Sequence, residues 1–148
     1  MKKITILIAL VVASGVAVAD DFGRSLNHVT YVVSDFDASK RFYTEVLGLK
    51  VIETPWLPEK QLALEFGDGR ELHLGEVAGV DINPNAINHF AMSVRDFDEF
   101  LAYLKAAGIV YTRLGGGDDF SIATRGDGVR QTWITDPDGY WIEINDID

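Results

Sequence analysis

The chain has 148 residues, 47% of them hydrophobic and 24% charged, which is the composition of a folded globular domain and excludes an intrinsically disordered chain. Its formal net charge of −10 repels phosphate backbones, and no stripe of Lys and Arg offsets this charge, so nucleic-acid binding is not expected. The sequence contains no cysteine, which excludes disulfides, a cysteine nucleophile and a lipid-modified cysteine anchor.

Residues 1–19 have the pattern of a cleavable secretory signal peptide. Two lysines near the start precede an apolar run, and the sequence AVA at 17–19 supplies the small residues that signal cleavage needs. The alternative is an uncleaved membrane anchor, but a Ser-Gly pair interrupts the run, which is shorter than the ~20 residues that span a bilayer. We therefore expect a periplasmic or secreted protein, with no membrane contact after cleavage and with residues 20–148 as one domain.

The mature chain opens with a predicted strand and helix. In LNHVTYVVSDFD, at residues 26–37, alternating bulky side chains predict a strand with His28 on the face opposite to them. The next residues, ASKRFYTEVLGLKV, carry apolar side chains at helical spacing. Asp35 suits the N-cap of this helix, and Gly48 ends it because glycine adopts a positive φ without a Cβ clash.

The same pattern returns in the second half of the chain. INHFAMSVRDFD, at residues 87–98, repeats the Asn-His start and the Val-x-Asp-Phe-Asp end of the first stretch, and a helical pattern runs from there to Gly108. GDGRELHLG at 67–75 aligns with PDGYWIEIN at 137–145, and both contain an Asp-Gly dipeptide typical of hairpin turns. Similarity at matched positions indicates a duplication.

The duplication predicts an α+β fold made of two βαβββ modules. The first module covers about 24–78 and the second about 85–148, with the Pro- and Asn-containing connector GVDINPNAI at 79–87 between them. In both modules we expect the bulky apolar face of the strands to lie under the helix. The other face carries histidines together with small or polar residues, which are poor core material but suit the lining of a cavity.

All three histidines of the chain occupy repeat-related positions on this cavity face. His28 corresponds to His89, and the aligned module ends place His73 opposite Glu143. Any one of them alone is more simply a hydrogen-bonded core residue, but four related positions favour a metal site. Two histidines and one carboxylate leave coordination positions open and suit one divalent ion of Fe, Mn, Ni, Co or Zn, with His73 as a fourth ligand.

The sequence resembles the vicinal oxygen chelate superfamily, which includes glyoxalase I, fosfomycin-resistance proteins, extradiol dioxygenases and bleomycin-resistance proteins. The stretches NHVTYVVSDFDASKRFYTEVLGLKV, LHL, NHFAMSVRDFDEFLAYLKAAGI and ITDPDGYWIEI carry the resemblance, across about residues 24–146. It implies a cup-shaped mixed β-sheet around one metal ion, with ligands at His28, His89 and Glu143. In glyoxalase I-like members the fourth ligand is often a glutamate, whereas this sequence has His73.

The resemblance also implies the chemistry of the site. In this superfamily the metal chelates two oxygens of a small-molecule substrate and stabilises the negative charge that develops on them. In the isomerase branch a metal-bound glutamate moves a proton, so Glu143 is the candidate catalytic base. Relatives are often dimers, and we expect a homodimer.

Substrate contacts are expected among aromatic and polar residues near the cup: Trp56, Tyr111, Arg113, Phe120, Arg125, Gln131 and Trp133. The two arginines suit a substrate carboxylate, although tryptophan and phenylalanine are more often core or interface residues. LGGGDDF at 114–120 lacks the Lys and Ser/Thr of a P-loop and is interpreted as a flexible loop over the cup mouth.

Export narrows the predicted function. Glyoxalase I and the fosfomycin thiol transferases use cytoplasmic thiols, as the resemblance implies, and an exported protein meets little of these. We predict a metal-dependent enzyme acting on a small oxygen-rich substrate, either a lyase or isomerase with glyoxalase I-like chemistry or an extradiol-type dioxygenase. A non-catalytic small-molecule or drug-binding protein of the bleomycin-resistance type is the alternative, but that branch lacks the metal residues that are intact here.

Overall fold

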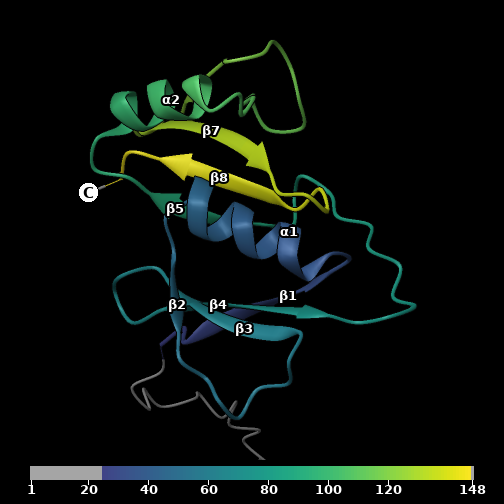
Figure 1. Cartoon of the computed structure of the whole chain (residues 1–148). Coiled ribbons are helices and arrows are strands. Elements are labelled where there is room, and N and C mark those ends of the chain that lie inside the picture. Colours follow the sequence, from purple (N-terminus) through teal and green to yellow (C-terminus); the bar gives the residue numbers. More distant parts are fainter. Residues whose placement is uncertain (1–24, 148) are drawn as a thin grey trace, which may run out of the picture.

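The computed structural model describes residues 25–147, which form two four-stranded mixed sheets, each with one α-helix (Figure 1). The first sheet has the order β1-β4-β3-β2 and contains β1 (His28–Val33), β2 (Lys50–Ile52), β3 (Gln61–Glu65) and β4 (Glu71–Glu76). The second has the order β5-β8-β7-β6 and contains β5 (His89–Ser93), β6 (Ala123–Thr124), β7 (Arg130–Thr135) and β8 (Trp141–Asn145). The repeated order confirms the predicted α+β fold of two βαβββ modules.

The predicted signal peptide, residues 1–19, lies outside the described residues. Within residues 25–147, no helix combines the length and the apolar character needed to cross a membrane.

Strand register confirms how the two modules align. In each sheet the first strand of the module runs parallel to the last, β1 beside β4 and β5 beside β8. His73 pairs with Thr30 in the first sheet, and Glu143 pairs with Ala91 in the second. His73 and Glu143 therefore occupy equivalent positions, as the aligned turn sequences predict.

The helices begin and end at the predicted signals. Asp35 caps α1 (Phe36–Arg41), its carboxylate accepting a hydrogen bond from the Ala38 N–H at 2.9 Å, and the chain continues as a short π-helix, η1 (Phe42–Val46). The second helix, α2, spans Phe97–Ala106. Gly48 and Gly108, which follow the two helical segments, have φ of 70° and 75°. Only glycine adopts these angles at low cost.

The second module departs from the predicted pattern after its helix. A full strand was expected there, but the chain makes only an isolated bridge between Thr112 and Trp133, and β6 is two residues long. The physical reason is the glycine run at 115–117, whose three residues all have positive φ. Such angles turn the chain away from the extended conformation that a strand requires.

Packing confirms the predicted strand faces. Leu72 and Leu74 on β4, and Ile142 and Ile144 on β8, are buried in one core with residues of both helical segments. The bulky residues of β1 and β5 pack against the same core. Figure 1 shows α1 lying between the two sheets and α2 covering the outer face of the second sheet. The faces opposite the helices carry the predicted metal ligands.

The turn between β7 and β8 fastens the second module to the first. Both carboxylate oxygens of Asp138 lie 3.1 Å from the Ser34 N–H at the end of β1. The buried Asp136 accepts a hydrogen bond of 2.9 Å from the hydroxyl of Tyr43, a residue of η1. The sequence predicted this segment only as a hairpin turn, yet its side chains form hydrogen bonds that join the modules, as does the Tyr103 hydroxyl, which donates to the Glu45 carbonyl oxygen at 2.9 Å.

Aromatic rings add to the same contact. Tyr140, just after the turn, stacks on Tyr31 of β1 with ring centroids 4.1 Å apart, and its hydroxyl donates to the Val32 carbonyl at 3.0 Å. Burial, together with the nearby charge of Asp136, raises the pKa of Tyr31 to about 12. The rings thus exclude water from the contact between the modules.

The two sheets remain separate within one chain. Among the described residues, β1 pairs only with β4 and β5 only with β8, which leaves one edge of each strand without a partner strand. The expected cup is therefore present as two halves.

Candidate metal centre

The second module brings His89 and Glu143 together on neighbouring strands. His89 Nδ1 lies 2.8 Å from the Ala86 carbonyl oxygen, and because a carbonyl only accepts hydrogen bonds, Nδ1 carries the ring hydrogen. In the neutral ring, Nε2 then presents a lone pair towards Glu143 Oε2, 3.3 Å away. Two such electron-pair donors facing each other fit a divalent cation.

Glu143 is held in apolar surroundings. Its side chain belongs to a residue only 8% exposed, and its Oε1 accepts a hydrogen bond of 2.8 Å from Asn145 Nδ2. Trp133 pairs with Glu143 across β7 and β8 and stands edge-on to the His89 ring, with centroids 6.2 Å apart. The Trp133 indole N–H is buried and has no hydrogen-bond partner among the described residues. Electrostatic interactions are strong in such a poorly hydrated environment.

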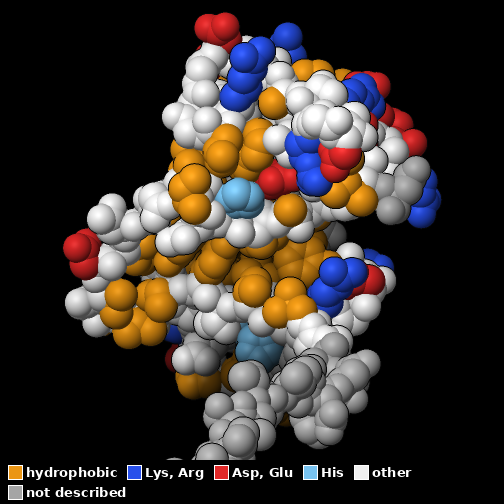
Figure 2. All heavy atoms as spheres, turned by 180° about the vertical axis from the view of Figure 1, so that it is seen from behind, with side chains coloured by type: hydrophobic (Ala, Val, Ile, Leu, Met, Phe, Trp, Pro, Cys, Tyr) orange, Lys and Arg blue, Asp and Glu red, His pale blue; other side chains and the backbone are white. Residues whose placement is uncertain are grey.

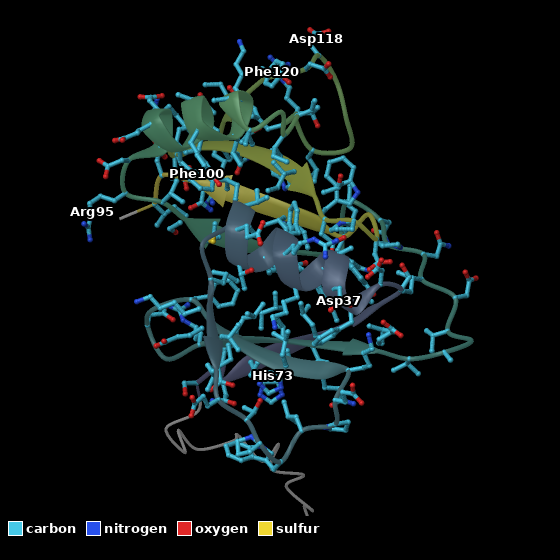
Figure 3. All side chains as sticks on the ribbon, in the orientation of Figure 1. Asp37, His73, Arg95, Phe100, Asp118 and Phe120 are labelled. Carbon is cyan, nitrogen blue, oxygen red and sulfur yellow. The ribbon has the colours of Figure 1, made fainter. Side chains whose placement is uncertain are left out.

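The first module holds its histidines differently. His28 Nδ1 lies 2.8 Å from the side-chain oxygen of Asn27, which can only accept, so His28 Nε2 also carries a lone pair. His73 Nε2 lies 2.7 Å from Glu71 Oε2. Figure 3 shows His73 on the face of the first sheet that points away from α1, as the strand alternation predicted.

The two histidines of the first module do not converge on one point. Their rings are stacked 4.2 Å apart and are parallel within 6°. Imidazole lone pairs lie in the ring plane, so stacked parallel rings direct them within two separate planes that do not meet. In this arrangement His28 is free to bind an ion, whereas His73 is engaged by Glu71.

The four predicted ligands do not meet within one chain. In residues 25–147, no three His, Asp or Glu side chains lie close enough to hold one metal ion. Figure 2 shows histidine side chains at two separate places on one face of the molecule, with hydrophobic side chains between them. Within one chain each module therefore presents half of the predicted set, and the convergence of all four ligands on one ion stays a prediction.

Two polar neighbours of the site have no role in the sequence-based prediction. The structure places Glu71 and Asn145 on the faces that carry His73 and Glu143, and each is bonded to that neighbour. The signal was available, because each lies two residues from its partner on one strand and side chains at i and i+2 share a face.

Of the predicted substrate contacts, two lie on the face of the second sheet that carries Glu143. Trp133 adjoins His89, and Gln131 pairs with Asn145 two positions along the same strand. A groove of about 470 Å³ opens beside His89, with Tyr31 and Tyr140 in its walls. The second sheet therefore supplies a ligand pair, and β1 and the connector supply most of the groove wall next to it.

The other predicted contacts lie elsewhere. Tyr111 is 7% exposed and packs edge-on against Phe120, whose ring in turn lies beneath Lys105 Nζ at 4.7 Å. Arg125 is paired with Asp127 at 2.7 Å, which satisfies the guanidinium locally. The remaining two are exposed: Arg113, and Trp56 with 75% of its surface accessible.

The loop interpreted as a cover for the cup lies beside the second helix. Figure 3 shows Phe120 and Asp118 near α2, at the end of the molecule opposite His73. In one chain, residues 114–120 therefore lie far from His73, one of the predicted ligands of the first module.

Known proteins share both sequence and fold with this chain. Residues 25–144 match the family model described as the Glyoxalase/Bleomycin resistance protein/Dioxygenase superfamily. A lactoylglutathione lyase of Arabidopsis thaliana is 32% identical over 130 residues, covering 82% of this chain and 44% of that protein, so this chain spans less than half of its length. A probable lactoylglutathione lyase of Vibrio parahaemolyticus is also 32% identical, covering 82% of this chain and 89% of the relative.

Solved structures agree with the fold. The oxidase ChaP-H2 superposes with a TM-score of 0.69 at 29% identity, covering 84% of this chain and 94% of its own. A glyoxalase/dioxygenase of Nostoc punctiforme superposes with a TM-score of 0.70, covering 92% of this chain and all of its own. Its 22% identity supports the fold alone.

Proposed function

Because the chain belongs to the glyoxalase/bleomycin resistance protein/dioxygenase superfamily, we propose that it is a metal-dependent lyase or isomerase with glyoxalase I-like chemistry. The observation that carries the proposal is the His89–Glu143 pair, in which Nε2 and Oε2 face each other 3.3 Å apart. Relatives named lactoylglutathione lyase, at 32% identity, support a lyase. The substrate is a small, oxygen-rich molecule able to chelate a divalent ion.

The complete site is proposed to form between two copies of the chain. His28 of one copy would join His89 and Glu143 of the other, since the two halves lie apart in a single chain. The edges of β1 and β5 that have no partner strand among the described residues support this arrangement. His28 and Thr30 on β1, and Ala91 and Ser93 on β5, are exposed beside those edges. A two-fold dimer would repeat the same contact twice and give two sites.

Each residue has a distinct task in this proposal. A divalent ion, when bound, stabilises the negative charge that develops on a substrate oxygen. His28 and His89 would hold it through Nε2, because their Nδ1 atoms donate to Asn27 and Ala86. Glu143 would bind through Oε2 and carry a proton between neighbouring substrate atoms. Trp133 keeps water away from the carboxylate, which strengthens these interactions.

An extradiol-type dioxygenase is the second candidate. Two histidines and one glutamate, with His73 engaged by Glu71, correspond to the facial ligand set of non-haem iron oxygenases. The 29% identity to the oxidase ChaP-H2 supports oxygen chemistry in a relative of the same fold. The same site would then bind a catechol-like substrate through both oxygens.

Export is part of the proposal. The basic start, the apolar run and the AVA sequence at 17–19 support removal of residues 1–19 by a signal peptidase. N-terminal sequencing of protein secreted by a bacterial host should begin at Asp20. A mature protein that still begins at Met1 would contradict export.

The metal content of the dialysed protein tests the site. Wild type should retain stoichiometric metal after loading with Fe, Mn, Ni, Co or Zn, whereas His89→Ala and Glu143→Ala should each weaken affinity about tenfold or more. Asp118→Asn is the control, since it alters a carboxylate away from the predicted ligands. Wild type that holds none of the five metals would refute the proposal. Assays with hemithioacetals, α-hydroxy ketones and catechols then separate isomerase from dioxygenase activity.

A further inference from the structure

A chain of polar side chains stands behind Glu143. Ser93 Oγ donates a hydrogen bond to Asn145 Oδ1 at 3.0 Å, and Asn145 Nδ2 donates to Glu143 Oε1 at 2.8 Å. Ser93 and Asn145 are directly paired in the β5–β8 ladder, and Asn145 is 2% exposed. The strand register itself therefore assembles the three side chains.

The orientation of the Asn145 amide is unambiguous. Its Oδ1 also accepts a hydrogen bond from the Ile147 backbone N–H at 3.3 Å, and a backbone N–H can only donate. The amide oxygen must therefore face Ser93 and Ile147. The NH₂ group must face Glu143, which as a carboxylate only accepts.

We infer that Asn145 is a positioning residue that makes Glu143 a ligand through one oxygen only. This inference rests on the proposed metal site. The hydrogen bond from Asn145 engages Oε1 and leaves Oε2 directed at His89 Nε2. A carboxylate bound through both oxygens would occupy one more coordination position, and a chelating substrate needs the open positions. Asn145 thus keeps the site open for substrate.

The first module has no equivalent of the hydrogen bond from Asn145. The position related to Asn145 is Gly75, which pairs with Gln61 as Asn145 pairs with Gln131. Gly75 has no side chain that could bond to a neighbouring ligand. The two halves of the site are therefore unequal at this repeat position, because an amide donates to Glu143 and no side chain at the related position can donate to His73.

Asn145→Leu tests the inference, because leucine keeps the volume and lacks the donor. With Co²⁺ as the probe, the variant should bind about 10 to 100 times more weakly than wild type. The visible absorption of bound Co²⁺ should also change, because it reports the number and geometry of the ligands. If Glu143 binds Co²⁺ through both oxygens in the variant, the affinity and the absorption spectrum should both differ from those of wild type.

Thr132→Val is the matched control. Thr132 is also fully buried in the second sheet, and its hydroxyl lies 2.9 Å from the carbonyl oxygens of Thr112 and Ser121. It alternates with Trp133 and so lies on the opposite face from Glu143. This variant loses a buried hydroxyl yet should bind Co²⁺ with wild-type affinity and spectrum.

The outcomes separate the inference from the proposed function. If Glu143→Gln loses Co²⁺ affinity while Asn145→Leu keeps the wild-type affinity and spectrum, the positioning role is refuted and the metal site stands. If wild type binds no Co²⁺, or Glu143→Gln binds it normally, both are refuted. Should Asn145→Leu fail to fold by circular dichroism, Asn145→Ala removes the same donor instead, and an unchanged affinity and spectrum in that variant refutes the inference.

Discussion

At the scale of single residues, the two histidines at the start of β1 and β5 are held by different acceptors. His28 donates to the side chain of Asn27, whereas His89 donates to the backbone carbonyl of Ala86. The sequence repeats Asn before both histidines, which suggests one shared role. The structure assigns that role to Asn27 alone, because the connector places the Ala86 carbonyl oxygen, and not the Asn88 side chain, beside His89 Nδ1.

Asn27→Ala and Asn88→Ala should therefore differ in effect. Asn27→Ala releases His28 Nδ1, so the ring loses its fixed orientation and metal affinity should fall about tenfold. Asn88→Ala leaves the His89–Ala86 bond intact and should bind metal as wild type does. Competition with a chromophoric chelator measures both affinities. Equal losses in the two variants would contradict the assignment.

At the scale of elements, the β7–β8 turn forms hydrogen bonds that join the second module to the first. Asp136 lies buried against Tyr43 and receives N–H groups from Asp138 and Tyr140. Burial raises the pKa of the Asp136 carboxyl despite these hydrogen bonds. The contact between the modules therefore includes Asp136, whose charged form is disfavoured by its own surroundings.

Asp136→Asn should change how stability depends on pH. In the wild type, the unfolded chain loses the proton of this carboxyl near its ordinary pKa of about 3.9, before the folded chain does. The unfolded state then binds fewer protons, so the free energy of unfolding falls as pH rises from there through the raised folded pKa. Asparagine does not titrate, so the free energy of unfolding of the variant should rise relative to that of wild type over this window.

Urea unfolding of both proteins at several pH values measures this difference. The opposite contribution of Asp146, whose pKa is lowered by hydrogen bonds from Arg130, is common to both proteins and cancels. The hydrogen-bond acceptor lost in asparagine adds an offset that does not vary with pH. A difference between the proteins that stays constant across the window would contradict the prediction.

At the scale of the whole molecule, the modules are joined in a way that keeps the two ligand halves apart. α1 lies between the sheets (Figure 1), and the turn bonds to Ser34 before it and to Tyr43 after it. The proposed pairing of His28 with His89 and Glu143 therefore crosses between copies. A site built in this way is incomplete without a dimer.

Mixed dimers test this arrangement directly. In a dimer of His28→Ala and His89→Ala chains, one site has both defects and the other has none. Random pairing of equal amounts should therefore restore about a quarter of all sites, although each variant alone has none intact. Co-expression followed by metal analysis measures the restoration. A mixture that binds no more metal than either variant alone would contradict a site shared between copies.

The side-chain alternation of β1, β4, β5 and β8 could be read from the sequence because strand period and burial leave little choice. Leu72 and Leu74 went to the core, and His73 to the opposite face, as the pattern required. The full strand expected after α2 does not form. The glycines at 115–117 all have positive φ, and the spacing of hydrophobic residues does not predict such backbone angles.

The sequence by itself determined the family, the two βαβββ modules and the face on which His28, His73, His89 and Glu143 lie, since each follows from local period and repetition. Only the tertiary structure decided which side chains meet: Glu71 with His73, Asn145 with Glu143, and Asp136 of the turn with Tyr43 of η1. Those contacts depend on how strands pair and modules pack, and a one-dimensional pattern contains no distances between its repeats.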